Sequence, residues 1–392
     1  MASQIKESAS CEFVDSDVIE IVSADEYDAH RAKLRSSLSW LISKVYGSQP
    51  PNDLKDPFYE NSEGQLVLRP VMVNLLSSSE LYCQACSNMF PETHTQWRGH
   101  WSIIQVLSRK GIYIQDIQDT AVTETVLVQT APFRLKAHLS LMDALMKAYS
   151  CEVASVEKVV KAVRNITAFP ASSELPGTTE EALTFWVNKV CAALTSDPAL
   201  SDGQLLEGET AQKVRIVSKS TSPRDPVKVP PMEDLMRDVG DGCNVAALIA
   251  YYRPGQLNIR DVCLKDSIGI ADSLYNLRQI GQFCRNHLPW RSFHLSYEDL
   301  LYTHDSMRVN ILTFLADLFY CFEGPGASLA NGNPGSIEQD RLEAMPAAGK
   351  RSAQTAVPNV PISGATKKSF QRLPFEDTAS NLGMGRSSLT SP

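Results

Sequence analysis

The sequence has 392 residues, of which 43% are hydrophobic and 21% are charged. These fractions are ordinary for a globular protein, and the length allows two or three domains. The formal net charge of −8 makes the chain a poor general binder of nucleic acid, which requires Lys and Arg concentrated against phosphate. We therefore expect no nucleic-acid partner.

The N-terminus and the cysteine content indicate a soluble protein of the cytoplasm. The first residues, MASQIKESASCEF, lack the apolar core of a signal peptide. No run of 18 or more apolar residues predicts a membrane span, so we expect no membrane insertion. Nine cysteines in 392 residues are too sparse for a disulfide scaffold and are interpreted as reduced thiols.

Apolar residues recur at helical spacing through the first half of the chain. The first helix is predicted to start near Asp25 and to end at Gly47. Further helices are predicted over residues 69–89, 97–110, 132–149 and 153–166. Residues 124–130 (ETVLVQT) are rich in β-branched side chains and predict a short strand. Residues 25–168 are therefore predicted to form an α-rich domain, for which a winged-helix-like arrangement remains open.

Three stretches are predicted to lie outside the folded domains. Residues 1–24 are polar, and residues 169–177 contain two prolines and two serines, as expected of a linker. Residues 324–392 are dominated by Gly, Pro, Ala, Ser, Asn and Thr. Such segments cannot bury enough apolar surface to offset the entropy of ordering, so we expect a disordered N-terminus and a disordered tail. No heptad run predicts a coiled coil.

The second half of the chain, residues 178–323, predicts an all-α bundle. Thr178 or Thr179 caps the first helix, and acidic residues follow in its first turn, where they suit the helix dipole. The next helix follows Asp241-Gly242, and two more are predicted at about 268–286 and 306–322. A long polar insertion at residues 196–231 interrupts the bundle.

Three segments of this bundle resemble the calponin-homology family. Residues 185–188 (FWVN) resemble the signature of its first helix. Residues 239–254 resemble its next segment, in which Asp-Gly is followed by an apolar helix and a proline. Residues 295–300 (LSYEDL) resemble the segment before its final helix. The fold class we expect is mostly α: an N-terminal helical unit, a calponin-homology-like bundle and a disordered tail.

The insertion and the N-terminal unit narrow the resemblance further. With residues 100–103 (HWSI) and 109–113 (RKGIY), the combination is similar to the N-terminal part of the calmodulin-regulated spectrin-associated proteins, also called CAMSAP or Patronin. This resemblance covers about residues 25–323. It implies a non-enzymatic cytoskeletal adaptor of the cytoplasm, associated with microtubule minus ends. Cytoskeletal proteins are its implied partners, among them microtubule-associated proteins, spectrin and calmodulin. The alternative function is direct binding of F-actin or spectrin by the calponin-homology domain. A remote alternative is that the protein is an enzyme.

The charge of the bundle bears on filament binding. The resemblance implies that, in that family, a C-terminal CKK domain binds microtubules with the help of coiled coils. We expect this chain to lack both. Residues 178–323 carry 14 basic and 19 acidic side chains, a net charge of −5. Microtubules and actin filaments are themselves acidic, and strong filament binders tend to carry two calponin-homology domains in tandem. We therefore predict tight binding to neither filament.

A pair of cysteines gives the first candidate metal site. Cys83 and Cys86 form a CxxC motif, and His94 and His100 follow it. A structural zinc site needs four converging ligands, and this spacing fits no standard finger. The motif also lies within a helical apolar pattern. We therefore interpret the cysteines as small apolar residues one helical turn apart.

A second candidate metal site consists of Asp238, Asp241 and Asn244. A calcium-binding EF-hand loop ends with a glutamate at its twelfth position, where this sequence has Ile249. Asp241-Gly242 is better interpreted as a turn that leads into a helix. We expect no metal and no cofactor.

Trp186 is a candidate partner-binding residue for which two interpretations are possible. It could be an exposed anchor at an interface, but its place in an apolar helical stripe favours a core position. The sequence contains no P-loop, no dinucleotide-binding glycine motif and no G-x-S-x-G motif. We therefore assign no catalytic residue, and the sequence does not identify the partner-binding face.

Overall fold

The computed structural model describes residues 21–62, 66–91, 95–115, 121–167, 175–196, 227–265, 267–288 and 292–325. Within these ranges the protein is mostly helical, as the sequence predicts. Most of the polar insertion, nearly all of the predicted disordered tail, and residues 1–20 lie outside them.

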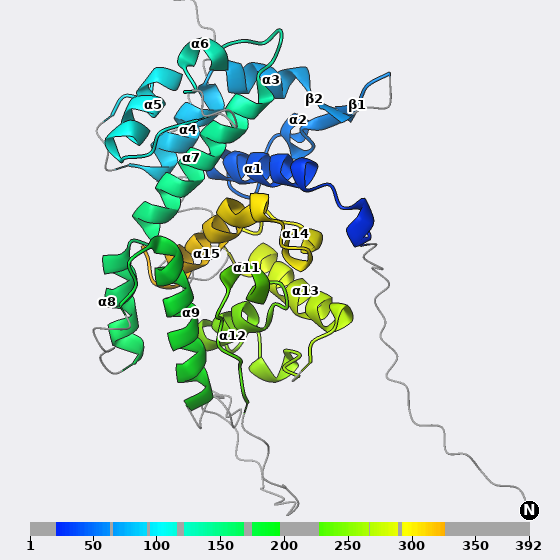
Figure 1. Cartoon of the computed structure of the whole chain (residues 1–392), viewed down its shortest axis with the longest axis vertical. Coiled ribbons are helices and arrows are strands. Elements are labelled where there is room, and N and C mark those ends of the chain that lie inside the picture. The colour runs from blue at the N-terminus through cyan, green and yellow to red at the C-terminus, as the bar shows by residue number, and fades with distance from the viewer. Residues whose placement is uncertain are drawn as a thin grey trace, which may run out of the picture. The chain divides into compact units, whose positions relative to one another are not determined.

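The first half of the chain combines helices with a two-stranded sheet (Figure 1). Helix α1 (Ala29–Tyr46) begins where the Asp28 carboxylate accepts hydrogen bonds from the His30 and Arg31 amides. It ends at Gly47, whose φ of +63° favours glycine. The elements that follow are α2 (Asn52–Lys55), β1 (Phe58–Glu60), β2 (Leu66–Leu68), α3 (Pro70–Ser77), α4 (Glu80–Met89), α5 (His100–Arg109), α6 (Glu124–Leu127) and α7 (Leu135–Val153).

Two predictions for this half are wrong. The helix predicted over 69–89 is interrupted, because Ser79 takes a left-handed φ of +63° between α3 and α4. The strand predicted at 124–130 is instead the short helix α6, which packs against α5 and α7 and buries Leu127 completely. The strands of the sheet, β1 and β2, pair antiparallel with Phe58 opposite Leu68. The segment that suggested a winged helix is therefore helical.

Among the described residues, the second half contains the four helices predicted for the bundle and three others, one of which, at residues 156–166, is predicted as part of the N-terminal unit. They are α8 (Val156–Ile166), α9 (Thr179–Ser196), α11 (Leu235–Asp238), α12 (Cys243–Tyr252), α13 (Ile270–His287), α14 (Tyr297–Leu301) and α15 (Arg308–Phe322). Short 3-10 helices are η1 (Ala24–Glu26), η3 (Ile259–Asp261) and η4 (Asp305–Met307). The predicted turn before α12 is confirmed. Gly242 has a φ of +71°, and a Cβ at this position would lie 2.9 Å from the Cβ of Asn276.

Buried apolar side chains form two clusters. One contains residues of α1 to α7, with Trp40 among its fully buried members. The other contains residues of α9 to α15, together with Val159 and Val163 of α8. We call the elements from η1 to α7 the N-terminal module and those from α8 to α15 the C-terminal module.

Trp186 lies in the centre of the C-terminal module. Its side chain is fully buried, and its ring packs edge-on against Phe319 with centroids 5.1 Å apart. The indole N–H donates to the Tyr252 hydroxyl at 3.0 Å. The prediction that Trp186 is a core residue is therefore confirmed.

Candidate functional site

The two modules contact each other along α7 and α15 (Figure 1). Helix α1 adds contacts to η4 and to α15. Ala32 of α1 belongs to the apolar cluster of the C-terminal module, and Val309 of α15 packs against the cluster of the N-terminal module. The modules therefore share a packed interface, which also contains three clusters of buried polar side chains.

The first polar cluster joins Lys44 of α1 to Asp317 of α15. The Lys44 ammonium lies 2.5 Å from Asp317 Oδ1 and 3.1 Å from the Tyr149 hydroxyl of α7. The Tyr149 hydroxyl donates to the same Asp317 oxygen at 2.6 Å. Burial, and after it the Asp317 charge, raises the pKa of Tyr149, so the hydroxyl keeps its proton and remains a donor.

The second polar cluster surrounds Lys33 of α1, which is also buried. Its ammonium lies 2.5 Å from Asp143 Oδ1 of α7 and donates to Asn310 Oδ1 of α15 at 2.6 Å. The Asn310 amide in turn donates to the Ser37 hydroxyl at 3.2 Å. Burial lowers the pKa of Lys33, and the nearby Asp143 charge opposes this effect. One cation thus links helices of both modules.

The third polar cluster forms around Asp299, whose side chain is fully buried. Asp299 Oδ1 accepts a hydrogen bond from the Tyr27 hydroxyl at 3.0 Å. Asp299 Oδ2 accepts from the Ser36 hydroxyl at 2.9 Å and from the Ser296 amide at 2.8 Å. Tyr27 and Ser36 belong to the N-terminal module, so this carboxylate also bridges the two modules.

These polar clusters impose one relative arrangement on the modules. A buried polar group that loses its partner costs about 1–3 kcal/mol, and a buried charge costs more. Sliding or separating the modules would break the Lys44–Asp317 pair and the hydrogen bond from Lys33 to Asn310. An apolar interface alone would tolerate small shifts more easily, so the hydrogen-bonded charges provide specificity.

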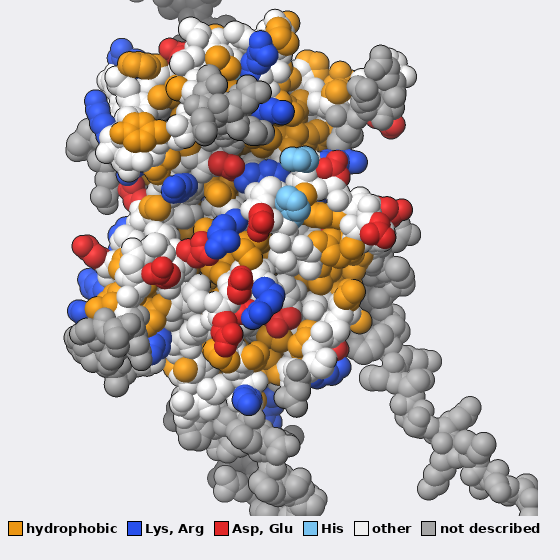
Figure 2. Space-filling model, in the orientation of Figure 1, with side chains coloured by type: hydrophobic (Ala, Val, Ile, Leu, Met, Phe, Trp, Pro, Cys, Tyr) orange, Lys and Arg blue, Asp and Glu red, His pale blue; other side chains and the backbone are white. Residues whose placement is uncertain are grey.

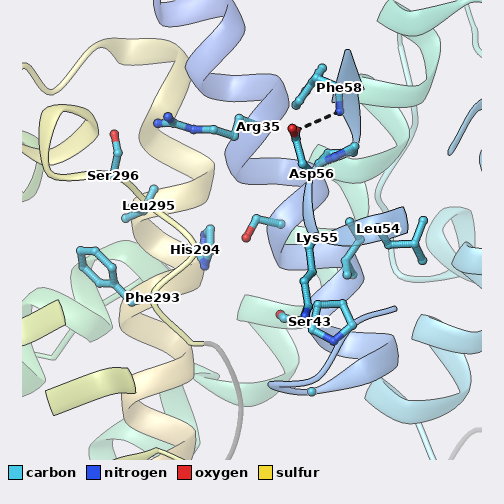
Figure 3. Close-up of a pocket in the computed structure, with 15 residues that line it drawn as sticks. Arg35, Ser43, Leu54, Lys55, Asp56, Phe58, Phe293, His294, Leu295 and Ser296 are labelled. Atoms are coloured by element: carbon cyan, nitrogen blue, oxygen red, sulfur yellow. Dashed lines mark hydrogen bonds between the residues drawn. The ribbon is translucent and has the colours of Figure 1, made fainter. Parts of the chain in front are cut away.

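A pocket of about 360 Å³ opens at the edge of this interface (Figure 3). One wall comes from α1 and from the segment joining α2 to β1, and the other comes from residues 293–296 of the C-terminal module. The apolar lining consists of Ile42, Pro50, Leu54, Pro57, Phe58, Phe293 and Leu295. The polar lining consists of Arg35, Ser39, Ser43, Lys55, Asp56, His294 and Ser296.

His294 is the buried titratable group of the pocket wall. Its ring nitrogens lie 3.1 Å from the Ser292 carbonyl oxygen and 3.2 Å from the Asn310 carbonyl oxygen. Burial lowers its pKa to about 4, with the nearby Asp317 charge opposing the shift. His294 is therefore neutral at physiological pH, and the positive charge of the pocket comes from Arg35 and Lys55.

The structure gives the cysteines and the histidine of the CxxC candidate site separate structural roles. Cys86 is fully buried in the N-terminal module, Cys83 is half-buried, and burial raises the pKa of both thiols. His100 Nε2 is paired with the Leu76 carbonyl oxygen at 2.9 Å. His94 lies outside the described residues. The part of the chain that the structure describes contains no cluster of three potential metal ligands.

Asp238, Asp241 and Asn244 likewise serve local backbone geometry. Asp238 Oδ2 accepts from the Glu233 and Asp234 amides, and Asp241 Oδ1 accepts from the Cys243 amide at 2.8 Å. The Asn244 side chain donates to the Pro230 carbonyl oxygen at 2.7 Å. Asp241 thus shapes the turn before α12, as the sequence predicts, whereas Asp238 binds the backbone before α11 and Asn244 binds the backbone at Pro230.

The sequence does not predict which residues join the two modules. Lys33, Lys44 and Asp317 are charged residues, and most of the residues next to them in their helices are buried. A charge among buried neighbours is the one sign in the sequence that these residues need a partner. The spacing within one helix cannot show which distant helix supplies the partner.

Among the described helices, none is both long enough and apolar enough to cross a membrane.

Comparisons with known proteins bear on both modules. Residues 18–152 match the family model described as "CAMSAP2-like, calponin-homology domain". Residues 220–304 match the one described as "CAMSAP CH domain". The first match identifies a calponin-homology domain where the sequence analysis expected only a helical unit. No solved structure matches the chain.

Curated relatives align with nearly the whole chain. Calmodulin-regulated spectrin-associated protein 1 from Homo sapiens is 41% identical over 369 residues, which cover 93% of this chain and 22% of that protein. Protein 1-B from Danio rerio is 37% identical over 370 residues, or 90% of this chain and 23% of the relative. Calmodulin-regulated spectrin-associated protein 2 from Mus musculus is 36% identical over 353 residues, which cover 88% of this chain and 23% of that protein. The chain therefore spans less than a quarter of the length of these relatives.

Proposed function

Since the chain belongs to the calmodulin-regulated spectrin-associated protein family, matching its N-terminal calponin-homology region, we propose that it acts as a non-enzymatic adaptor of the cytoskeleton. The family is cytoskeletal, and both modules match its calponin-homology models. The adaptor mechanism is the part that goes beyond the family assignment, and it depends on how the two modules are joined.

The observation that carries this proposal is the buried polar interface between the modules. An adaptor has to present its contact surfaces in a fixed arrangement. The Lys44–Asp317 pair and the hydrogen bonds from Tyr149 to Asp317 and from Lys33 to Asn310 join α1 and α7 to α15. Polar groups elsewhere, such as Asp241 and Asn244, are engaged in local turns. The arrangement suits protein–protein contact, for which a rigid surface reduces the entropy cost of binding.

Candidate partners follow from the names of the relatives. Those proteins are called calmodulin-regulated and spectrin-associated. We propose that this chain contacts spectrin, calmodulin or microtubule-associated proteins in the cytoplasm. Exposed aromatic side chains, Trp101 at 58% and Tyr113 at 73%, offer contact surface on the N-terminal module away from the pocket.

Proximity labelling in cultured cells tests the adaptor proposal. The full chain, fused to a labelling enzyme, is compared with the Trp186→Ala variant, in which the core of the C-terminal module is damaged. We expect the intact chain to enrich cytoskeletal proteins over the variant. Equal enrichment by the two chains, or enrichment of no cytoskeletal protein, contradicts the proposal.

Direct F-actin binding is the second candidate function. The specific observation in its favour is that two calponin-homology matches occur in one chain, as in strong filament binders. Charge opposes it, since residues 178–323 carry a net charge of −5 and residues 25–168 carry 15 basic and 15 acidic side chains. On the face in Figure 2, the Lys and Arg side chains of the described residues alternate with Asp and Glu.

Co-sedimentation with pure filaments at physiological salt decides between the two candidates. We expect the chain to remain largely in the supernatant with F-actin and with microtubules, because both filaments are acidic. Pelleting with a micromolar or tighter Kd would favour direct filament binding over the adaptor function.

A further inference from the structure

Neither the fold nor the family comparison assigns a role to the pocket at the module interface. Its volume of about 360 Å³ falls in the range of ligand pockets in proteins. Its walls come from both modules, so any occupant touches α1 and residues 293–296 at once (Figure 3). The chemistry of its lining indicates what that occupant is.

Arg35 of α1 supplies hydrogen-bond donors to the pocket. Its guanidinium lies 3.6 Å from Asp299 Oδ2, longer than a hydrogen bond, and 51% of its side chain is exposed. Asp299 already accepts three hydrogen bonds, from the Tyr27 and Ser36 hydroxyls and the Ser296 amide. Arg35 thus forms an ion pair with Asp299 but no hydrogen bond to it, so its N–H groups can still form a two-pronged contact with an incoming carboxylate.

Lys55 supplies the second positive charge. It is exposed, and no ion pair joins it to another described residue. In the view of Figure 3, Arg35 lies toward Ser296 at one end, whereas Lys55 lies toward Ser43 at the other. The one carboxylate in the lining, Asp56, is engaged through Oδ1 by the Phe58 amide at 3.2 Å. The pocket is thus net positive within a chain of net charge −8.

Apolar side chains also line the pocket. Leu54, Phe58, Phe293 and Leu295 all line it, and each keeps less than a tenth of its surface exposed. A small inorganic anion would leave this apolar surface uncovered. A lining that combines two cations with apolar side chains is complementary to a peptide segment that carries both acidic and apolar residues.

We propose that this pocket binds a short acidic peptide segment of a partner protein. One carboxylate of the segment pairs with Arg35, a second pairs with Lys55, and an apolar side chain of the segment packs against Leu54 and Phe293. The proposal rests on the adaptor function, since it names the chemistry of the partner. Because the peptide contacts both modules, its binding also stabilises their interface, as any ligand of the folded state does.

Selection from a random peptide library displayed on phage tests the proposal on the purified full chain. We expect the selected peptides to share two acidic residues and at least one apolar residue. A selection that yields no consensus, or a consensus without Asp or Glu, overturns the proposal. A consensus that matches residues 12–20 of this chain (EFVDSDVIE) would instead assign the pocket to an internal segment and overturn the partner assignment.

The selected peptide, labelled with fluorescein, then serves as the probe for matched variants. Arg35→Gln with Lys55→Gln should weaken its binding by roughly tenfold or more, since two charge-assisted contacts are lost. Arg31→Gln with Lys147→Gln is the control, because these exposed cations lie on α1 and α7 but do not line the pocket. Equal loss of binding in both double variants, or in neither, overturns the proposal.

Thermal melting and proximity labelling separate failure of this proposal from other outcomes. The Arg35→Gln, Lys55→Gln variant should still unfold in one cooperative transition, which shows that it folds although it loses the Arg35–Asp299 ion pair. If it fails to bind the peptide but labels the same cytoskeletal proteins in cells, the adaptor function stands and the pocket is not its partner site. Loss of those proteins from the labelled set supports both proposals.

Discussion

The Lys44 ammonium on α1 lies 2.5 Å from the Asp317 carboxylate on α15, 273 residues later in the chain. Only 8% of the Lys44 side chain and 1% of the Asp317 side chain remain exposed. Asp317 Oδ1 also accepts from the Tyr149 hydroxyl, whereas Oδ2 has no hydrogen-bond partner among the described residues. A buried carboxylate with one unpartnered oxygen depends strongly on the cation beside it.

Replacing Asp317 by Asn should therefore destabilise the protein. The variant leaves the Lys44 charge buried without its counter-ion, and removing one partner of a buried pair costs about 3–5 kcal/mol. Urea-induced unfolding of the full chain measures the loss. The double variant Lys44→Met, Asp317→Leu should recover much of the stability, because no isolated charge remains. A loss below about 1 kcal/mol in Asp317→Asn, the value of an exposed pair, would contradict the interpretation.

Truncating Trp186 should damage the C-terminal module. Its fully buried ring packs on Phe319, and its indole N–H is bonded to Tyr252. Removal of a large buried aromatic costs about 3–5 kcal/mol, so Trp186→Ala should melt at a clearly lower temperature. Trp186→Phe keeps most of the packing and should lose less. An alanine variant with unchanged melting temperature and weakened partner binding would make Trp186 an interface residue instead.

Stability should decrease as the pH falls below neutrality. Burial lowers the pKa of both His138 and His294 to about 4. Because histidine in the unfolded chain titrates near 6.5, the unfolded state binds more protons between these two values. Each residue should therefore reduce the free energy of unfolding by about 1 kcal/mol between pH 7 and pH 5.5. NMR titration of the imidazole protons provides the direct check, and midpoints near 6.5 would refute the prediction.

The two cysteines of the CxxC motif should differ in their response to substitution. Cys83→Ser should change the melting temperature little, because this side chain is half-buried. Cys86→Ser places a hydroxyl in a fully buried apolar site, where an unpaired polar group costs about 1–3 kcal/mol. We predict no stoichiometric zinc in the purified chain. Elemental analysis that finds one zinc per chain, lost in the double variant, would reverse this interpretation.

The sequence predicts most helices of the fold because their apolar residues follow helical spacing. The expected helix after Asp241-Gly242 is α12, and the apolar stripe of residues 311–322 lies within α15. The prediction fails where a local pattern has two outcomes. Residues 124–130 have the composition of a strand, but Leu127 is buried in a short helix that packs on α5 and α7.

The candidate site could not be predicted from the sequence, for a physical reason. Its residues are far apart in the chain, since Arg35 and Lys55 meet residues 293–296 only when the modules pack. An ion pair such as Lys33–Asp143 has no signature at a fixed spacing. The charged positions within apolar helices show only that partners are needed, and the fold determines which ones are available.

We expect the buried polar interface to hold the two modules together as one rigid unit. The chain's own thiols test it, because Cys86 is buried in the N-terminal module and Cys284 is buried in the C-terminal module. Brief alkylation across a series of urea concentrations, followed by mass spectrometry, measures when each thiol becomes exposed. We predict that both become reactive at the same urea concentration, and that in Asp317→Asn the two midpoints shift down and separate. Two well-separated midpoints in the unmodified chain would contradict the account.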